Sequence, residues 1–198
     1  YNTVPICGFI YHDEVNHCKP VKYSWSGGEE KVSLGGAFKL NAELYLTALW
    51  NKLFDMQIIE KFNVRFDENL SMGEDLRFSV EYFEKSDTEF VYAFSAHLYH
   101  YTKLSENTLM SDFARGNAED GIKSLKMIYD LAVKYNSDAE LEYNKAVKNL
   151  KDNYIYFLVR DKKYSWKQQL KKIRGFSEKY TLLTFFVDKL KAVREKFV

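Results

Sequence analysis

Apolar and polar positions in the first third of the chain follow the period of β-strands. Residues 4–11 form a nearly continuous apolar run that ends at polar residues, which predicts a buried strand. The other segments that predict strands are 21–25, 31–34, 90–94 and 97–101. Because Gly27-Gly28 separates the second and third segments, we expect these two to form a hairpin, and we expect the last two in an antiparallel or edge position.

Apolar steps of three or four residues predict helices in the rest of the chain. The helices predicted in the first half cover residues 39–50, 56–62 and 71–85. From residue 111 onward the pattern is helical throughout, and its last apolar stripe joins Phe176, Tyr180, Leu183, Val187, Leu190 and Phe197. We therefore predict an α+β fold with a mixed region at residues 1–108 and a helical extension at residues 109–198.

Charge is distributed unevenly along the 198 residues. The net charge is only +1, but residues 162–198 hold eleven Lys or Arg and three acids, so this tail carries +8 and the remainder −7. A basic end on an acidic body predicts peripheral contact with an anionic membrane surface. The alternative is a solvated helix face that packs on the body. Nucleic acid is not expected as a partner, because the positive charge is confined to the end and no reader motif is present.

The cysteine and histidine content gives no sign of a disulfide framework or a metal site. Cys7 and Cys18 are the two cysteines, and no metal-ligand spacing joins them to His12 or His17. We expect a cytoplasmic location, with a peripheral position at the inner membrane face if the basic tail binds lipid. The chain does not begin with Met, and its first residues have the pattern of the middle of a strand, so we expect it to be a piece of a longer polypeptide.

Two adjacent carboxylates, Glu74 and Asp75, are the first candidates for chemistry. Ser71 and Glu74 have the spacing of a capping box, and acids in a first helical turn are favoured by the helix dipole. Capping leaves Asp75 without a role. Because a helix N-terminus lowers the pKa of a carboxylate, we expect Asp75 to be ionised and able to accept a proton from a hydroxyl. On the residues alone, a helix cap and a general base both remain open.

Two further segments combine aromatic, amide and basic side chains. Trp50, Asn51 and Lys52 could stack on a sugar or base, hold hydroxyls and meet a phosphate, or they could close the preceding helix and point to solvent. His100, between two tyrosines, could bind a metal or a phosphate, or it could be a hydrogen-bonded structural residue.

The order and spacing of these segments carry more information than each segment alone. The segments are 6–9 (ICGF), 49–54 (LWNKLF), 58–59 (II), 63–68 (NVRFDE), 72–78 (MGEDLRF) and 99–101 (YHY), with Ser105 beyond. This series resembles the C-terminal half of family-2 glycosyltransferases of the GT-A fold, over roughly residues 3–108. The helical remainder is similar only in being a helical extension, which many members carry.

The resemblance implies roles for the candidate residues. Asp75 would be the general base that deprotonates the acceptor hydroxyl, and Glu74 would orient it or cap the helix. The residues that would line the acceptor groove are Trp50, Asn51 and Lys52. The residues that would lie near the donor diphosphate are His100, Lys103 and Ser105. The implied reaction is inverting: a glycan or lipid-linked acceptor attacks the anomeric carbon of a nucleotide sugar, and Mg²⁺ or Mn²⁺ neutralises the leaving diphosphate.

One departure from the family limits this interpretation. The family binds its metal through an Asp-x-Asp motif, and no such motif precedes Glu74 and Asp75 in this sequence. We therefore expect no metal ligands in this chain and no sugar transfer by this chain alone. The competing hypothesis is a non-enzymatic helical interaction domain that docks on a membrane or a partner through its basic face. An open groove shared by Asp75 and Trp50 would favour the glycosyltransferase.

Overall fold

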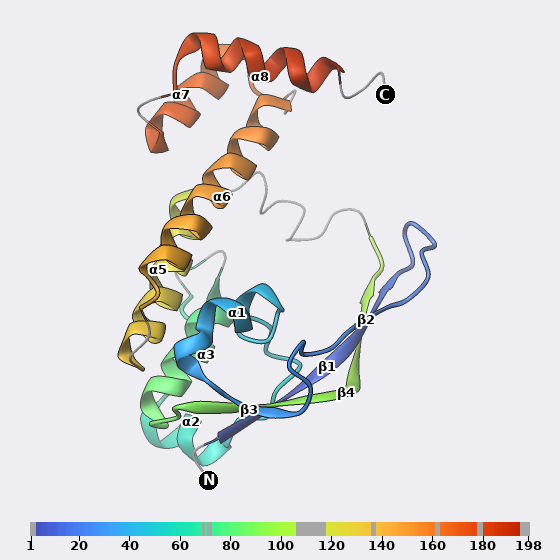
Figure 1. The fold of residues 1–198 in the computed structure, drawn as a ribbon, viewed down its shortest axis with the longest axis vertical. Helices are drawn as coiled ribbons and strands as arrows, with labels where there is room; N and C mark the ends of the chain where they lie inside the picture. Colours follow the sequence, from blue (N-terminus) through green and yellow to red (C-terminus); the bar gives the residue numbers. More distant parts are fainter. Residues whose placement is uncertain are drawn as a thin grey trace. The chain divides into compact units, whose positions relative to one another are not determined.

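The computed structural model describes residues 3–68, 70, 73–105, 118–135, 138–160, 163–177 and 180–194. Within these residues the strands are β1 (Thr3–Asp13), β2 (Val21–Tyr23), β3 (Glu30–Ser33) and β4 (Phe90–Lys103). The helices are η1 (Leu34–Gly36), α1 (Ala37–Ala42), α2 (Met56–Phe62), α3 (Glu74–Lys85), α5 (Ala118–Lys134), α6 (Glu140–Arg160), α7 (Trp166–Phe176) and α8 (Leu182–Arg194). Strands and helices are largely segregated along the chain, so the fold is α+β, as predicted (Figure 1).

The four strands form one mixed sheet in the order β2-β1-β4-β3. β1 and β4 run parallel at its centre, β2 pairs antiparallel with β1, and β3 pairs antiparallel with β4. The predicted hairpin between residues 21–25 and 31–34 is therefore wrong, because its two strands lie at opposite edges of the sheet. Residues 90–94 and 97–101 belong to one internal strand, β4, so the predicted edge position is wrong, whereas the predicted antiparallel position holds for the pairing with β3.

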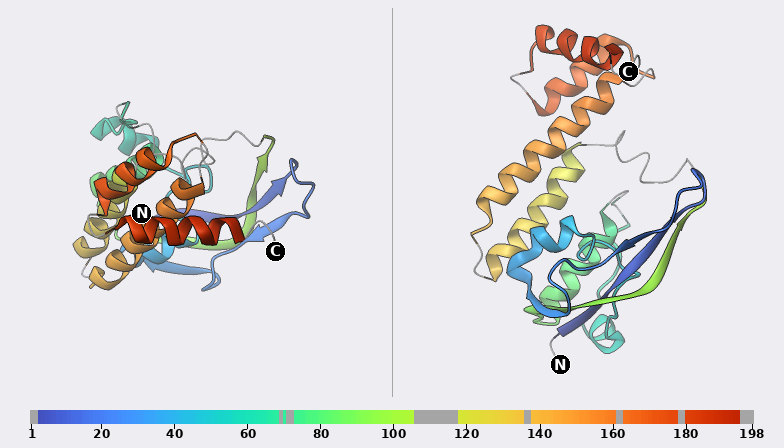
Figure 2. Two further views of the ribbon diagram at one scale, coloured as in Figure 1. Left: turned by 90° about the horizontal axis from the view of Figure 1, so that it is seen from above. Right: turned by 45° about the vertical axis from the view of Figure 1, so that its right-hand side comes forward.

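Burial decreases along each central strand from its first half to its second half. In the first halves, Val4, Ile6, Val91 and Ala93 alternate into the core that α3 and α5 cover. The register then shifts at Gly8, where an added Cβ would lie 2.6 Å from the Tyr23 carbonyl oxygen. Beyond this bulge, β1, β4 and β2 extend away from α1 and α3 (Figure 2). Glycine at this position therefore lets the three strands continue as an exposed ribbon.

α2 has the bounds that the apolar pattern predicted. Asp55 caps its first turn by accepting a 2.8 Å hydrogen bond from the Gln57 amide, and Asn63 ends it in the left-handed conformation. The helix predicted over residues 39–50 is wrong in length, because α1 ends at Ala42. Leu44 then adopts a φ of 64°, and the turn buries Tyr45 and Leu46 completely. The amides of Tyr45 and Leu46 both donate to the Leu40 carbonyl, so the chain turns where the two buried side chains follow the helix.

α3 carries the acidic pair at its first two positions. Its cap is Gly73, at a φ of 84°, rather than the predicted Ser71, which lies outside the described residues. The amide of Arg77 donates to the Gly73 carbonyl over 2.9 Å, so Glu74 and Asp75 stand in the first turn. A Cβ on Gly73 would lie 2.7 Å from Ser124 Oγ of α5. The start of α3 is therefore held close to α5.

The chain divides into two compact units. The mixed unit comprises Tyr1–Glu106 and Lys123–Tyr143, and the helical unit comprises Asn107–Ile122 and Asn144–Val198. These are units of packing, and the assignment of residues 1–108 and 109–198 as domains stays a prediction. None of the described helices combines the length and the apolarity that a bilayer crossing requires.

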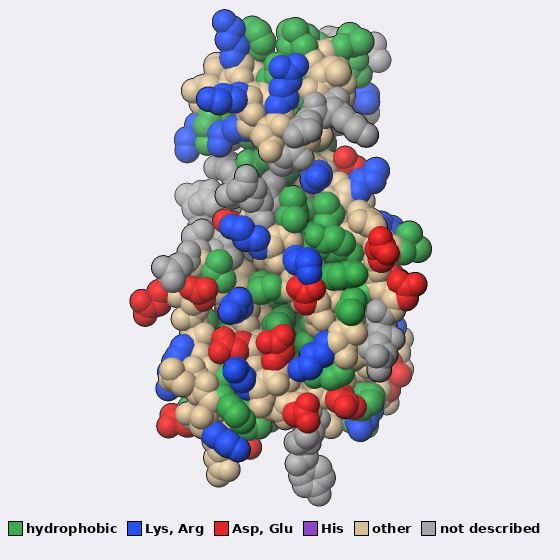
Figure 3. Space-filling view, turned by 90° about the vertical axis from the view of Figure 1, so that its left-hand side faces the viewer, with side chains coloured by type: hydrophobic (Ala, Val, Ile, Leu, Met, Phe, Trp, Pro, Cys, Tyr) green, Lys and Arg blue, Asp and Glu red, His purple; other side chains and the backbone are tan. Residues whose placement is uncertain are grey.

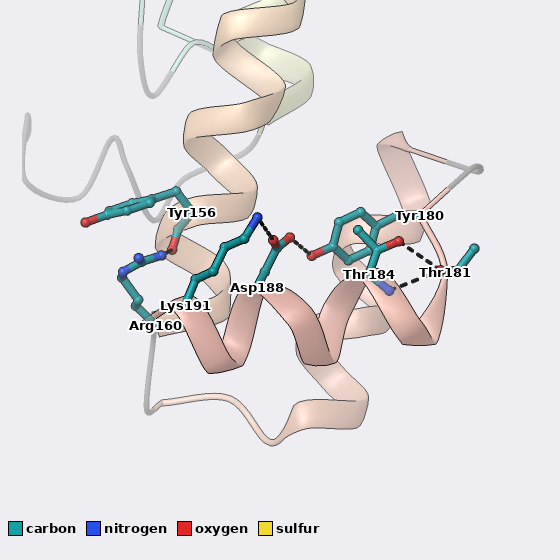
Figure 4. Close-up of polar contacts among 7 residues, drawn as sticks. All are labelled: Tyr156, Arg160, Tyr180, Thr181, Thr184, Asp188 and Lys191. Atoms are coloured by element: carbon teal, nitrogen blue, oxygen red, sulfur yellow. Dashed lines mark hydrogen bonds and ion pairs between the residues drawn. The ribbon is translucent and has the colours of Figure 1, made fainter. Parts of the chain in front are cut away.

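The helical unit has its own core and a partly buried polar contact beside it. The core residues are Leu158, Val159, Leu170, Ile173, Tyr180, Phe185 and Ala192. The Tyr180 hydroxyl donates to Asp188, and Lys191 Nζ lies 3.8 Å from the same carboxylate (Figure 4). Burial and the negative charge of Asp188 raise the pKa of Tyr180. These residues border an open pocket of about 440 Å³ within the unit.

The last apolar stripe predicted from the sequence does not form one buried face. α7 ends at Phe176 and α8 begins at Leu182, so the stripe is interrupted. Among its members with described side chains, Tyr180 is buried, but Leu183 and Val187 are exposed, and Phe185 points into the core instead. The side chains of Phe176, Leu190 and Phe197 lie outside the described residues. The prediction failed because the first half of α8 is apolar around most of its circumference, which leaves the core-facing side ambiguous in sequence.

Candidate functional site

An open pocket of about 400 Å³ lies in the mixed unit where the segment 50–53 meets β1 and β4. Its lining residues are Pro5, Ile6, Cys7, Trp50, Asn51, Lys52, Leu53, Phe94, Leu98 and Tyr99. The lining is mainly apolar and aromatic with a few polar groups, which is the usual composition of a small-molecule site. All three residues of the predicted Trp-Asn-Lys segment therefore line one pocket.

Backbone pairing with β1 holds this segment in place. The Cys7 amide donates to the Asn51 carbonyl over 2.8 Å, and the Leu53 amide donates to the Pro5 carbonyl over 3.2 Å. Between them, Lys52 forms an isolated antiparallel bridge with Ile6. The segment is therefore a short strand-like addition to the sheet, and its side chains are positioned by the backbone of β1.

Trp50 is the centre of an aromatic cluster at the pocket. Its ring stacks on Tyr99 with centroids 4.5 Å apart and planes 19° apart, and it meets Phe9 edge-on at 4.8 Å. Phe9 in turn stacks on Tyr23 of β2 at 4.7 Å. Rings that hold one another in this way present fixed flat surfaces to a ligand.

The aromatic surface continues along the exposed ribbon. The ring centroid of Tyr101 lies 5.4 Å from that of Trp50 and 5.9 Å from that of Tyr11, on which Tyr101 stacks. The stripe ends at an ion pair between Lys103 Nζ and Asp13, 3.6 Å apart. Because alternate residues of a strand share a face, all of these side chains belong to one face of the β1–β4 pair. Lys103, a predicted site residue, therefore lies at the far end of the face that Trp50 begins.

Lys52 is a buried lysine, only 7% exposed. Its ammonium donates to the Ala48 carbonyl and, over 2.9 Å, to Asn51 Oδ1. Asn51 is itself buried and donates to the Leu44 carbonyl over 3.2 Å. Burial lowers the pKa of Lys52 to about 7, although the negative charge of Asp75 acts in the opposite direction. The predicted alternative of a solvated lysine is therefore wrong.

Asp75 is partly buried, and its environment differs from the one expected from sequence. Burial raises its pKa and the adjacent charge of Glu74 raises it further, whereas the charge of Lys52 lowers it. The predicted lowering by the helix N-terminus is wrong, because burial and Glu74 outweigh the favourable charges. Asp75 is not among the residues that line the pocket, but it is close enough to Lys52 for each to shift the pKa of the other.

The other predicted residues lie away from this cluster. His100 lies between Tyr99 and Tyr101 and so belongs to the opposite face of β4, where its ring stacks on His12 with Nδ1 2.9 Å from His12 Nε2. Ser105 is exposed just beyond β4. The structure therefore brings together Trp50, Asn51, Lys52 and, through charge, Asp75, but not His100.

Sequence reasoning missed the residues that build the aromatic face. They are Phe9, Tyr11, Tyr23, Tyr99 and Tyr101. Their alternation along residues 9–11 and 99–101 was the available signal, since period two places them on one side of a strand. The titratable histidine between the tyrosines was chosen instead.

Within the described part of the chain, no group of three or more His, Cys, Asp or Glu could hold a metal ion. The described residues therefore do not fit the divalent cation that the resemblance implies, and none of them is assigned to it. The cation of the complete reaction stays a prediction.

Comparison with known proteins gives only weak similarity, and only to solved structures. No protein-family model and no curated protein matches the sequence. Among solved structures, the crystal structure of S. aureus TarS 1-349 in complex with UDP-GlcNAc is similar, with 19% sequence identity and a TM-score of 0.45. The match covers 96% of this chain and 47% of that chain, so the protein spans about half the length of that structure. A similarity this weak carries no functional information, and the function of the chain has to be inferred from its own residues.

Proposed function

We propose that the mixed unit is the acceptor side of an inverting glycosyltransferase, with Asp75 as the general base. The observation that carries the proposal is the link between Asp75 and Lys52. Lys52 lines the aromatic pocket, and each of these two residues shifts the pKa of the other. A carboxylate of raised pKa therefore stands close to a pocket whose lining suits a sugar.

The pocket has the properties that saccharide binding requires. A sugar ring has an apolar face that packs on aromatic rings, and Trp50 and Tyr99 offer stacked rings at the pocket. The volume of about 400 Å³ falls within the range of small-ligand sites. The aromatic face continues over Tyr101 and Tyr11, so a longer glycan could lie along the ribbon.

The chemistry assigned to Asp75 is removal of one proton. As the acceptor hydroxyl oxygen bonds to the anomeric carbon of the nucleotide sugar, Asp75 takes the hydroxyl proton and the nucleoside diphosphate leaves with the electron pair of the broken bond. Because the pKa of Asp75 is raised, it is a stronger base than an ordinary aspartate. Glu74 contributes by its charge, which raises that pKa further.

Saccharide binding tests the pocket without any need for turnover. We expect Tyr99→Ala to weaken the affinity for a glycan acceptor about tenfold, because it removes one stacked ring. Tyr99 is 36% exposed, so the variant should fold. Tyr156→Ala is the matched control, since Tyr156 is 45% exposed in the helical unit. Equal affinity of both variants by isothermal titration would remove the pocket from the proposal.

Asp75→Asn tests the base in an enzyme where a nucleotide-binding half accompanies this chain. We expect kcat to fall by about 10²–10⁴-fold while acceptor affinity is unchanged, because the amide keeps the shape but accepts no proton. With Asp75 intact, the rate should fall as pH drops through the raised pKa, at a higher pH than for an ordinary carboxylate. Retained transfer in the Asn variant would exclude Asp75 as the base, even if the binding test succeeds.

A second role is favoured by one observation on the helical unit. Large apolar side chains are exposed there among lysines, which suits the interaction domain considered as the alternative. Surface docking by this unit is compatible with sugar transfer by the mixed unit.

A further inference from the structure

α8 presents apolar side chains on two opposite sides. Phe185 and Ala192 face the core of the helical unit. The apolar strip, defined as Leu182, Leu183, Phe186 and Val187, is exposed, with Leu183 at 76%. Residues at positions i, i+1, i+4 and i+5 share one side of a helix, so the strip is continuous. The core therefore uses one side of α8 and leaves the other side, equally apolar, in solvent.

Trp166 of α7 extends the strip onto a second helix. It is half-exposed, and its ring centroid lies 6.2 Å from that of Phe186. Exposed large hydrophobic residues that cluster in this way mark interaction surfaces, whereas isolated ones need no explanation. Tryptophan in particular is enriched at the boundary between hydrocarbon and water, because its ring is apolar and its N–H is polar.

Basic side chains border the apolar strip. Lys167 Nζ lies 5.5 Å from the ring centroid of Trp166, and Lys171 follows one turn later on an exposed side of α7. Lys191 is exposed on α8 beyond the strip. Figure 3 shows Lys and Arg side chains next to hydrophobic ones over these helices. An apolar strip with a basic border is complementary to a surface that is apolar inside and negatively charged outside.

We propose that α7 and α8 bind the surface of an anionic phospholipid bilayer. The helices lie in the plane of the interface, the apolar strip enters the acyl boundary, and the lysines contact the headgroups. Each lysine near an anionic leaflet is attracted to the headgroups, and the apolar strip gains the hydrophobic effect when it leaves water. A nucleic-acid partner would leave the apolar strip exposed, and an ordinary protein partner would not need an excess of one charge.

The inference concerns the helical unit and is independent of glycosyl transfer. It also gives the +8 charge of residues 162–198 a task that the aromatic pocket does not use. Whether the mixed unit transfers sugar or not, binding to lipid can be measured by itself.

Sedimentation of the full chain with lipid vesicles tests the proposal. We expect binding to vesicles of phosphatidylcholine with phosphatidylglycerol, and at least about tenfold weaker binding to phosphatidylcholine alone. Leu183→Glu/Phe186→Glu should abolish binding, because it places two acids in the apolar strip. Leu141→Glu is the matched control, since Leu141 is 78% exposed on the first turn of α6, and it should bind as the wild type does.

Charge-reversal variants distinguish binding to anionic lipid from simple hydrophobic adhesion. Lys167→Glu/Lys171→Glu should weaken binding to the anionic vesicles about tenfold or more. Lys61→Glu/Lys85→Glu changes the net charge equally at exposed sites of the mixed unit and should have a smaller effect. Equal losses in both pairs would mean that only net charge matters and would overturn the proposed surface.

Two further results would also overturn it. One is equal binding of the wild type to neutral and anionic vesicles, or no binding to either. The other is an oligomer of the wild type that Leu183→Glu/Phe186→Glu dissociates, because a second copy would then cover the strip. If circular dichroism shows that the double Glu variant does not fold, brominated lipid provides the test. It should quench the tryptophan fluorescence of the wild type more than that of Trp166→Phe. Equal quenching of the two would refute insertion of Trp166.

Discussion

The aromatic pocket of the mixed unit and the apolar strip of the helical unit depart from ordinary burial in opposite directions. The mixed unit buries a lysine and an asparagine, Lys52 and Asn51, beside an aromatic pocket. The helical unit leaves Leu183 and Phe186 in solvent, on the other side of a helix whose Phe185 is fully buried. Both arrangements cost stability, since a buried charge loses its hydration and an exposed apolar strip orders water. Such costs persist where the group has a task, which is why we place a chemical site in one unit and a docking surface in the other.

Phe185 and Phe186 give the strongest test of this contrast, because they are adjacent in sequence and one is buried while the other is exposed. We expect Phe185→Ala to lower the free energy of unfolding of the helical unit by about 3–5 kcal/mol, because it leaves a cavity in the core. Phe186→Ala should change it by less than about 0.5 kcal/mol, because this ring is 48% exposed. Guanidinium unfolding of the two variants measures the difference. Equal destabilisation would mean that the strip is part of the core.

The burial of Lys52 gives a second test, in the mixed unit, through the pH dependence of stability. Its pKa is about 7 when folded, against 10.5 for an ordinary lysine. Between these values the unfolded chain binds a proton that the folded chain does not, so the free energy of unfolding rises as the pH is raised through this interval. The rise amounts to a few kcal/mol, on the order of 1.4 kcal/mol per pH unit.

Lys52→Met removes the titrating group and should flatten this dependence between pH 7 and 9. Lys85→Met, at an exposed lysine of the same unit, is the control and should leave the slope unchanged. Urea unfolding at several pH values gives the slope directly. A wild-type stability that falls from pH 7 to 9 would contradict the assigned burial of Lys52.

A smaller effect is expected at Gly73, which positions the acidic pair. Gly73→Ala should lower the free energy of unfolding by about 1–2 kcal/mol, because a residue with a side chain is strained at a φ of 84° and its Cβ would press on Ser124 Oγ. Gly175→Ala is the matched control: it lies in α7 with no atom near its Cβ, so alanine should stabilise by up to about 1 kcal/mol. Thermal unfolding with the same sign for both variants would show that Gly73 is not strained.

Local signals were sufficient for some elements and insufficient for their pairing. α2 was predicted with its observed bounds from its apolar pattern, and in the structure Asp55 and Asn63 cap it within a few residues. The strands at residues 21–23 and 30–33 were recognised as strands but were paired with each other, although their partners are β1 and β4. A period of two indicates which face a residue takes, but it carries no information on which distant strand lies beside it.

The candidate site was predictable in its residue types but not in its environments. The segment from Trp50 to Lys52 was selected for its chemistry, and the pocket contains it. The burial of Lys52 and the raised pKa of Asp75 depend on how β1, α3 and the segment 50–53 pack, which no local pattern specifies. For the same reason His100 was preferred to Tyr99, although only the tyrosine contacts Trp50.

The parallel pairing of the two central strands also affects how the protein is made. β1 begins at Thr3 and its partner at Phe90, so the first strand emerges from the ribosome long before it can pair. Closing so long a loop costs chain entropy before any contact between the two strands forms, which makes folding slow. Meanwhile the apolar segment of β1 presents an open edge to other nascent chains. We expect the newly synthesised chain to depend on chaperones until residue 103 has left the exit tunnel.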